Sequence, residues 1–139
     1  MNFPEKINIL SHKTTIVPRY SETDQGGVIH NSVYPVWFEI GRTELLRANK
    51  VAYKDLEAAG FLFVVAELHI KYRRPAFYDE TLEIETTCEK VTASKIIHNY
   101  KITRPGTGIT VAEGMTALAC ITKQGKVTRI PEFMYPAQA

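Results

Sequence analysis

The 139-residue sequence contains few cysteines, little net charge and no long hydrophobic run. Its two cysteines, Cys88 and Cys120, lie in strand-like segments without the spacing of metal ligands, so we interpret them as small buried hydrophobic residues. The net charge of +2 is too small to indicate a nucleic-acid partner. No apolar run approaches the ~20 residues of a membrane helix, and the first residues lack a signal-peptide core. We therefore expect a soluble cytoplasmic protein with no nucleic-acid partner and no membrane insertion.

Several catalytic motifs are also missing. The chain contains no G-x-x-x-x-G-K-[ST] phosphate loop, no G-x-G-x-x-G after a strand and no G-x-S-x-G nucleophile turn. None of the four histidines falls at a metal-ligand spacing: His12, His30, His69 and His98. We expect neither a bound metal nor another cofactor, which leaves carboxylate chemistry without a metal.

The hydrophobic pattern changes its period once along the chain. The expected elements are a strand over 14–20, a helix from Asn31 or Ser32 to about Asn49, a helix over Tyr53–Ala59 and four later strands. Alternation of apolar and polar residues predicts those strands, and their short connections favour antiparallel pairing. Gly114 is interpreted as a bulge in the last strand.

The first two turns of the long helix have almost no polar face, which is typical of a buried helix. A single sheet wrapped around this helix would cover it on every side. Glu39 is the polar exception, and we expect it to pair with Arg42 one turn later. The length suits one domain over residues 1–139 of the α+β class.

The connection between the first strand and the long helix contains paired glycines, Gly26 and Gly27, and the carboxylate of Asp24. A helix N-terminus presents free N–H groups and positive dipole density. Asp24 is therefore a candidate base or nucleophile beside an oxyanion site. The structural alternative is an Asx turn that stabilises the glycine loop. Glu22 in the same loop is expected to be solvated.

Three more residues near this loop have two interpretations each. Asn31 either caps the helix or presents its N–H or side chain to a reacting carbonyl. His30 either packs at the loop or contacts the same carbonyl. Tyr20 is either a core residue or a hydroxyl near the site.

Lys71, Arg73 and Arg74 form a basic stretch in one predicted strand. Such a stretch is usually a solvated strand face. The functional alternative is that it binds the phosphates of an anionic ligand.

The segment from Asp24 to Leu46 reads D-Q-G-G-V-I-H-N-S-V-Y-P-V-W-F-E-I-G-R-T-E-L-L. It resembles the signature of hot-dog-fold acyl-CoA thioesterases of the 4-hydroxybenzoyl-CoA thioesterase type. The segment from Lys71 to Leu82 resembles the junction between the second and third strands of that family. The resemblance implies an antiparallel sheet of five to six strands around one long central helix. It also implies edge-to-edge homodimers, often paired into homotetramers, with active sites at the subunit interface.

The resemblance also implies roles for individual residues. Asp24 would attack the thioester or activate water, the backbone N–H of Asn31 would polarise the carbonyl, and Tyr20 would lie in the site. Close relatives often have a histidine at the position of Asn31, so the expected contact is that of the backbone. His30 would take over a role in proton transfer only if its ring points inward. The residues expected to bind substrate are Gly27, Val28, Tyr34, Lys71, Arg73 and Arg74.

The hypothesis that follows is an acyl-CoA thioesterase that releases a free acid and coenzyme A, the latter being part of the substrate. Two alternatives stay open. One is a hot-dog-fold enoyl-CoA hydratase or dehydratase that uses an aspartate–histidine pair. The other is an acyl-CoA-binding module without catalytic activity.

Overall fold

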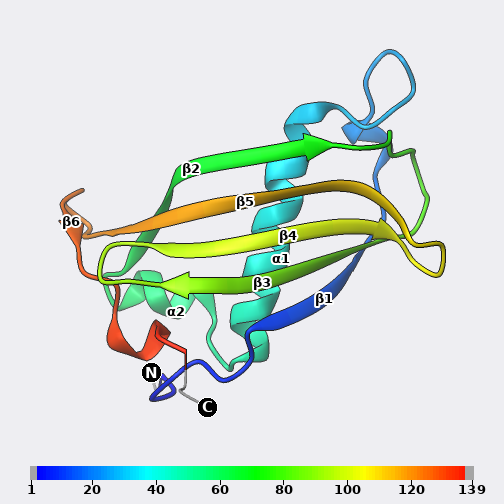
Figure 1. Ribbon diagram of the computed structural model, residues 1–139. Coiled ribbons are helices and arrows are strands. Elements are labelled where there is room, and N and C mark those ends of the chain that lie inside the picture. Colours follow the sequence, from blue (N-terminus) through cyan, green and yellow to red (C-terminus); the bar gives the residue numbers. More distant parts are fainter. Residues whose placement is uncertain (1–2, 137–139) are drawn as a thin grey trace.

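The computed structural model describes residues 3–136, and its elements follow the two hydrophobic periods of the sequence (Figure 1). The strands are β1 (Ser11–Ile16), β2 (Leu62–Tyr72), β3 (Leu82–Val91), β4 (Ile96–Arg104), β5 (Ile109–Ile121) and β6 (Val127–Thr128). The helices are α1 (Tyr34–Ala48) and α2 (Tyr53–Ala58), and short 3-10 turns span Tyr20–Glu22, Asn31–Val33 and Glu132–Met134.

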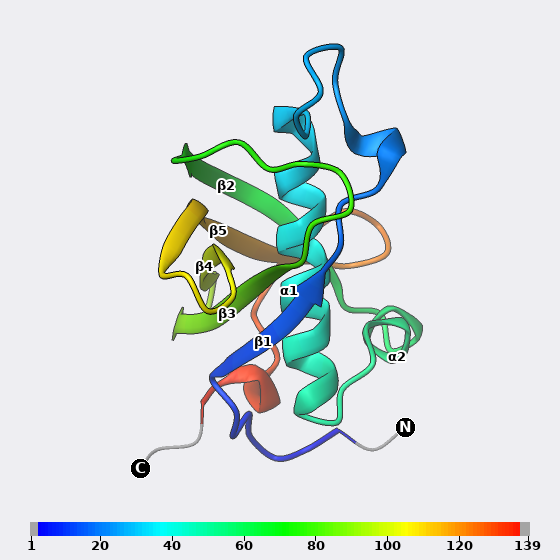
Figure 2. The same cartoon turned by 90° about the vertical axis from the view of Figure 1, so that its right-hand side faces the viewer.

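The strands form one sheet in the order β1-β3-β4-β5-β2, with β6 paired to β5. Every pairing is antiparallel. The sheet curves along one side of α1, as the two views of the ribbon show (Figures 1 and 2). The predicted α+β arrangement, an antiparallel sheet around one long helix, is confirmed.

Helix α1 binds the sheet through a stripe of large and small residues. Trp37, Phe38, Gly41 and Leu45 are buried, at a spacing that places them on one face of the helix. The Phe38 ring stacks on Tyr100 of β4 with 4.2 Å between the ring centroids. This stripe is the interior of the fold, and it fixes the position of the helix start.

Two glycines allow the helix to approach the sheet closely. A Cβ atom at Gly114 would lie 2.3 Å from the His69 carbonyl oxygen and 2.8 Å from the Phe38 ring. A Cβ atom at Gly41 would lie 2.2 Å from Thr86 Oγ1. The predicted bulge at Gly114 is wrong, because the register shifts of the sheet lie elsewhere. Because Gly114 has no side chain, the Phe38 ring can pack against this strand.

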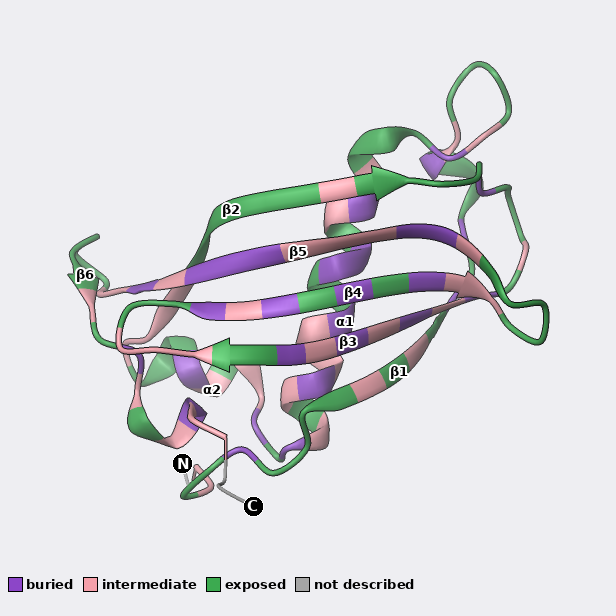
Figure 3. Cartoon of the chain, in the orientation of Figure 1, coloured by how far each residue is buried: buried purple, intermediate pink, exposed green. Residues whose placement is uncertain are grey.

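The expectation that the sheet covers α1 on every side is also wrong for the single chain. The sheet packs on one side only, and Val36 and Ile40 are 49% and 39% exposed. Exposed and buried segments alternate along the helix (Figure 3). Apolar residues on its open side therefore have no cover within residues 3–136.

The first strand and the long helix have bounds that differ from the prediction. β1 ends at Ile16 rather than at Tyr20, since Pro18 lacks the N–H that a ladder needs. α1 begins at Tyr34, after the 3-10 turn that contains Asn31. His30 caps this 3-10 turn, because its Nδ1 accepts a hydrogen bond from Ser32 N–H at 3.1 Å, whereas the N-cap of α1 itself is Val33, which makes no side-chain cap.

Candidate active site

The loop between β1 and α1 holds Asp24 at its exposed tip. Oδ1 of Asp24 accepts hydrogen bonds from the N–H groups of Gly26 at 2.8 Å and Val28 at 3.4 Å. Gly27 closes the turn by donating to the Asp24 carbonyl at 3.1 Å, with a φ of +83° that favours glycine. The Asx-turn interpretation is therefore confirmed. Oδ2 makes no hydrogen bond to any residue in the range 3–136, so one carboxylate oxygen is available to a ligand.

The base of the same loop contains a buried carboxylate, which the sequence interpretation placed in solvent. Glu22 is 8% exposed. Its Oε1 accepts the Arg19 N–H at 2.7 Å, and its Oε2 accepts the indole N–H of Trp37 at 3.2 Å. The Arg19 guanidinium lies 3.5 Å from the same carboxylate. Glu22 is thus a structural anchor, because a buried charge must be hydrogen-bonded to be tolerated. Sequence alone does not show that the loop folds back onto Trp37.

The N–H groups at the start of the helix are largely occupied. His30 N–H donates to the Glu22 carbonyl at 2.9 Å, and Val33 N–H donates to the His30 carbonyl at 3.1 Å. Ser32 N–H donates to the His30 ring. Asn31 N–H has no acceptor among the described residues, and it is the free donor of this turn.

The peptide group that follows Asn31 is held by a hydrogen bond from Tyr72. Tyr72, at the end of β2, donates its hydroxyl hydrogen to the Asn31 carbonyl oxygen at 2.9 Å. The Tyr72 ring also packs edge-on against Tyr34, with 5.0 Å between centroids. Burial raises the pKa of both phenols, and that of Tyr34 is raised further by Tyr72. Tyr72 therefore orients the turn as a neutral donor, a role that only the folded pairing of distant residues discloses.

A cleft of about 310 Å³ lies at this turn. It is lined by Ile29, Asn31, Tyr34, Tyr72, Arg73, Arg74 and Pro75. The structure thus brings together four residues that the sequence analysis had selected: Asn31, Tyr34, Arg73 and Arg74. The residues that line the cleft include Asn31, whose amide N–H is free, and two arginines, a set suited to an oxyanion and a polyanionic ligand.

The two arginines differ in their partners. Arg73 forms an ion pair with Glu113 on β5 at 2.5 Å. The Arg74 side chain has no ion pair with a residue of the described range, while its N–H donates to Val111. Arg74 is therefore the cation with its charge available.

Other selected residues do not line the cleft. Tyr20 is 75% exposed and packs edge-on against Tyr78, so the core interpretation is wrong. Lys71 borders a separate hollow on the sheet, together with Lys101 and Glu113. The His30 ring is exposed and its Nδ1 is engaged by Ser32, with 2.8 Å to the hydroxyl oxygen. Asp24, Gly27 and Val28 lie in the adjacent loop.

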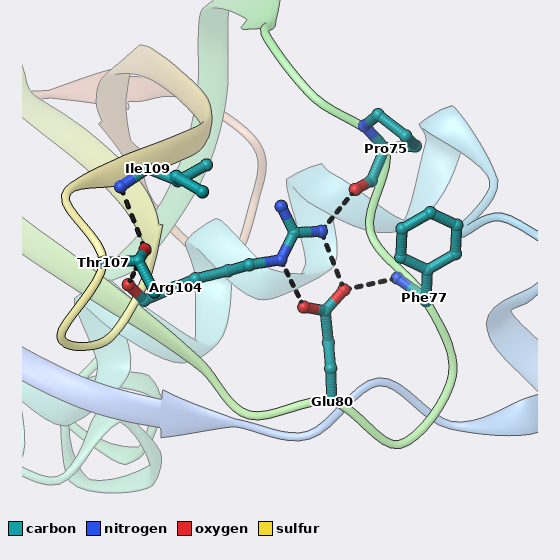
Figure 4. A network of polar contacts seen from close by, with 6 residues as sticks. All are labelled: Pro75, Phe77, Glu80, Arg104, Thr107 and Ile109. Carbon is teal, nitrogen blue, oxygen red and sulfur yellow. Dashed lines mark hydrogen bonds and ion pairs between the residues drawn. The ribbon is translucent and has the colours of Figure 1, made fainter.

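The loop is supported by the segment before β3. Val28 pairs with Phe77, and Ile29 N–H donates to the Ala76 carbonyl at 2.9 Å. Figure 4 shows how that segment is held: Glu80 accepts the Phe77 N–H at 2.6 Å and binds Arg104.

Arg104 completes this support. Its Nε donates to Glu80 Oε1 at 2.6 Å, and its Nη2 donates to the Pro75 carbonyl at 2.7 Å (Figure 4). Burial opposes ionisation of Glu80, but the hydrogen bonds from Arg104 and Phe77 outweigh it and lower the pKa of Glu80. An ionised Glu80 therefore ties the strand ends to the segment beneath the Asp24 loop.

The carboxylate expected to pair with Arg42 lies farther along α1. Glu39 is 3.8 Å from the Arg42 guanidinium, so the predicted pair is present. The Glu39 side chain is 68% exposed rather than buried, which makes the contact a weak one.

The described residues show no metal centre and no membrane helix. No three histidine, cysteine, aspartate or glutamate side chains of residues 3–136 are grouped as a metal ion would require. None of the helices in that range is long and apolar enough to cross a membrane.

Comparisons with known proteins agree on one family. The family model of the thioesterase-like superfamily matches residues 18–138. The putative acyl-CoA thioesterase YneP of Bacillus subtilis is 33% identical over 112 residues, which cover 81% of this chain and 80% of YneP.

Solved structures give the same result. A DHNA-CoA thioesterase from Staphylococcus aureus superposes with a TM-score of 0.82 at 32% identity, covering 86% of this chain and 80% of that one. A hypothetical protein from Thermus thermophilus has a TM-score of 0.80 at 36% identity, with 86% and 90% coverage. The predicted hot-dog fold is confirmed by these superpositions.

Proposed function

Because the chain belongs to the thioesterase-like superfamily and is a thioester hydrolase, we propose that it hydrolyses an acyl-CoA at the turn that begins α1. The observation that carries this proposal is the free N–H of Asn31, held in a cleft by Tyr72 and bordered by the loop of Asp24. The acyl group and the assignment to the 4-hydroxybenzoyl-CoA type are finer statements that stay predictions.

In the proposed reaction, the thioester carbonyl oxygen accepts the Asn31 N–H. Negative charge develops on this oxygen when a nucleophile adds to the carbon, and a preorganised amide donor stabilises it by about 3 kcal/mol. The carbon–sulfur bond then breaks and the electron pair leaves on the coenzyme A sulfur. The thiol product has a pKa of about 8.5, so the thiolate leaves without a strong general acid.

Asp24 supplies the base or the nucleophile of the reaction. Its Oδ2 either takes a proton from the attacking water or attacks the carbonyl carbon itself, forming an anhydride that water then cleaves. Both routes use one carboxylate and consume one water. The Asx turn supports this role, because it fixes Oδ1 and leaves Oδ2 available.

The phosphates of coenzyme A are assigned to the arginine side of the cleft. Arg74 has its charge available, whereas Arg73 is paired with Glu113. We therefore assign the main phosphate contact to Arg74 and a lesser one to Arg73. Lys71, Gly27 and Val28 stay predictions as substrate contacts, and Tyr20 stays a prediction as a hydroxyl in the active site.

We further propose that two chains pair along β2, with the homotetramer as the next level of assembly. β2 is an edge strand, and Val64, Val65 and Leu68 on it are 41%, 47% and 41% exposed. An apolar edge strand of this length is a template for pairing with another chain. The exposed side of α1 lies beside the same edge, since Val36, Val65 and Leu68 line one groove. Pairing there would cover the open side of the helix.

The proposal needs no metal or other cofactor, and the cytoplasmic location expected from the sequence stays a prediction. A preparation treated with a metal chelator should keep its full rate of thiol release. A chelator-sensitive rate that zinc or magnesium restores would contradict this part.

The test of the activity is thiol release by the purified protein from aromatic, short, branched and long acyl-CoAs. We expect steady release from at least one of them, at more than a hundred times the rate without protein. One enoyl-CoA in the panel separates the hydratase alternative, which would consume the double bond without releasing thiol. Tight acyl-CoA binding with no thiol release over hours would favour the binding module instead.

A further inference from the structure

Asn31 has hydrogen-bonded peptide groups on both sides, although its own N–H has no acceptor among residues 3–136. This N–H belongs to the peptide group that Asn31 shares with His30. The carbonyl of Asn31 belongs to the next peptide group, which it shares with Ser32. Each peptide group is planar, so the direction of the free N–H depends on how firmly these two planes are held.

The peptide group before Asn31 is held by the backbone. Its carbonyl, that of His30, accepts the Val33 N–H at 3.1 Å. The N–H of His30 donates to the Glu22 carbonyl at 2.9 Å, which fixes the chain one residue earlier. These contacts use main-chain atoms only, so they do not depend on which side chains surround the turn.

The peptide group after Asn31 is held by two side chains. Its N–H, that of Ser32, donates to His30 Nδ1 at 3.1 Å. Its carbonyl, that of Asn31, accepts the Tyr72 hydroxyl hydrogen at 2.9 Å. Hydrogen bonds on opposite edges of a plane oppose its rotation, and this plane is joined through the Asn31 Cα atom to the plane that carries the free N–H. The two side chains therefore control the direction of that N–H.

Tyr72 can hold the turn because the sheet holds Tyr72. The strand ends at this residue, and the next two N–H groups, of Arg73 and Arg74, both donate to the Val111 carbonyl of β5, at 2.8 and 3.0 Å. The Tyr72 ring packs edge-on against Tyr34, with 5.0 Å between the centroids. The hydroxyl thus connects the position of the sheet to a turn 41 residues away in the sequence.

The His30 ring acts in this turn as an acceptor. Its Nδ1 receives the Ser32 N–H and lies 2.8 Å from the Ser32 hydroxyl oxygen. A nitrogen that accepts an N–H carries no proton itself, so the ring is bound in its neutral form. An asparagine oxygen could accept the same N–H as an N-cap, but an asparagine could not transfer a proton.

We infer that Tyr72 and His30 are positioning residues, which together direct the Asn31 N–H toward the thioester carbonyl. The inference rests on the proposed function, because Asn31 must be the oxyanion donor. It adds Tyr72 to the residues that determine the rate, and it makes His30 a hydrogen-bond acceptor instead of an acid or base. A loosened donor costs most in the transition state, since the charge on the carbonyl oxygen develops only there.

The experiment measures kcat and KM for one acyl-CoA that the wild type hydrolyses. Tyr72→Phe keeps the ring and removes the hydrogen bond, so kcat should fall about tenfold while KM changes less than about twofold. His30→Ala removes the acceptor of the Ser32 N–H and should give the same division between kcat and KM. Tyr78→Phe is the matched control, because it removes the hydroxyl of a 54% exposed tyrosine outside the cleft and should keep the wild-type kcat.

His30→Asn separates positioning from proton transfer. The asparagine oxygen can accept the Ser32 N–H, so kcat should stay within about threefold of the wild type. A fall of about tenfold or more in a folded His30→Asn protein would assign proton transfer to the imidazole and overturn the inference for His30. Circular dichroism and urea unfolding check that each variant is folded, and His30→Asn is compared with the wild type even if His30→Ala does not fold.

The inference for Tyr72 is overturned if Tyr72→Phe keeps the wild-type kcat, or if the change appears in KM alone. Failure of the proposed function gives a different result, which is no thiol release from any acyl-CoA by the wild type. In that case Asn31 is not an oxyanion donor, and the inference fails together with the proposed function.

Discussion

Two carboxylates separated by a single residue, Glu22 and Asp24, have opposite surroundings in this fold. Glu22 is buried and all its neighbours are structural: the Arg19 N–H, the Arg19 guanidinium and the Trp37 indole. Asp24 is exposed and binds only the N–H groups of its own turn. The same side-chain chemistry is thus used once to hold the loop and once to present a free oxygen.

Glu22 also fixes the loop relative to the start of α1. The Glu22 carbonyl also accepts the His30 N–H, so one residue connects the loop base to the helix start. The distance between the Asp24 carboxylate and the Asn31 amide then depends on a buried anchor that touches neither. A site of this kind needs its reactive groups placed within fractions of an ångström.

The sharpest test of the comparison is Asp24→Asn. The amide oxygen can replace Oδ1 in the turn, but the side chain can no longer act as base or nucleophile. We expect kcat to fall at least about a hundredfold, or about 2.7 kcal/mol in activation free energy, with the melting temperature unchanged. Thiol release and thermal unfolding are measured on the same preparation.

Asp24→Ala is the matched variant, because it removes the turn hydrogen bonds as well. It should lose activity to the same extent and also lose some stability, which separates the two functions of the carboxylate. Near-wild-type turnover by Asp24→Asn would eliminate the proposed mechanism.

The opposite profile is expected for Glu22→Ala. This change leaves the Trp37 and Arg19 N–H groups without acceptors in a buried place, so the free energy of unfolding should fall by about 2 kcal/mol. Urea unfolding measures the loss. Glu22→Gln keeps one acceptor oxygen and should lose less. A Glu22→Ala variant as stable as the wild type would show that the carboxylate is not an anchor.

Trp37→Phe removes one hydrogen bond of that anchor together with part of the buried ring. The ring stays apolar but the indole N–H is gone, and we expect a loss of about 1 kcal/mol from the hydrogen bond. A double-mutant cycle with Glu22→Ala, which removes both acceptor oxygens, should show a coupling energy of similar size, since the two residues share the contact. If the losses in unfolding free energy of the two variants are additive, Trp37 stabilises the fold by packing alone.

The sequence was sufficient for the fold and for part of the site. The change from helical to strand periodicity predicted α1 and the four long strands, because burial on one face dictates both patterns. The free amide at Asn31 and the Asx turn of Asp24 were within reach of local rules, since each depends on residues within a few positions.

Long-range contacts were not predictable in the same way. Glu22 was placed in solvent because its partner Trp37 is fifteen residues away and meets it only after the loop folds back. Tyr72 reaches Asn31 over 41 residues through the position of β2 beside the helix. Gly114 was taken for a bulge, because no local signal shows that a ring from α1 occupies its place.

The smallest expected effect concerns the outer support of the loop, where Glu80 binds Arg104 and the Phe77 N–H. Glu80→Gln keeps the shape and removes the charge, so we expect a loss of about 0.5 kcal/mol near neutral pH. The pKa of Glu80 is lowered in the folded protein from an ordinary value of 4.5, so its ionised form stabilises the fold above about that pH. This contribution is lost as the pH falls through the lowered pKa.

The stability difference between wild type and Glu80→Gln should therefore be constant from pH 7 to about pH 5 and shrink below pH 4.5. Thermal unfolding across that range measures it. A difference that grows as the medium becomes more acidic would have the wrong sign for an ionised Glu80. In that case packing would support the segment at Phe77. Glu22 would then be the one charged residue that anchors the loop, in contrast to the exposed carboxylate of Asp24.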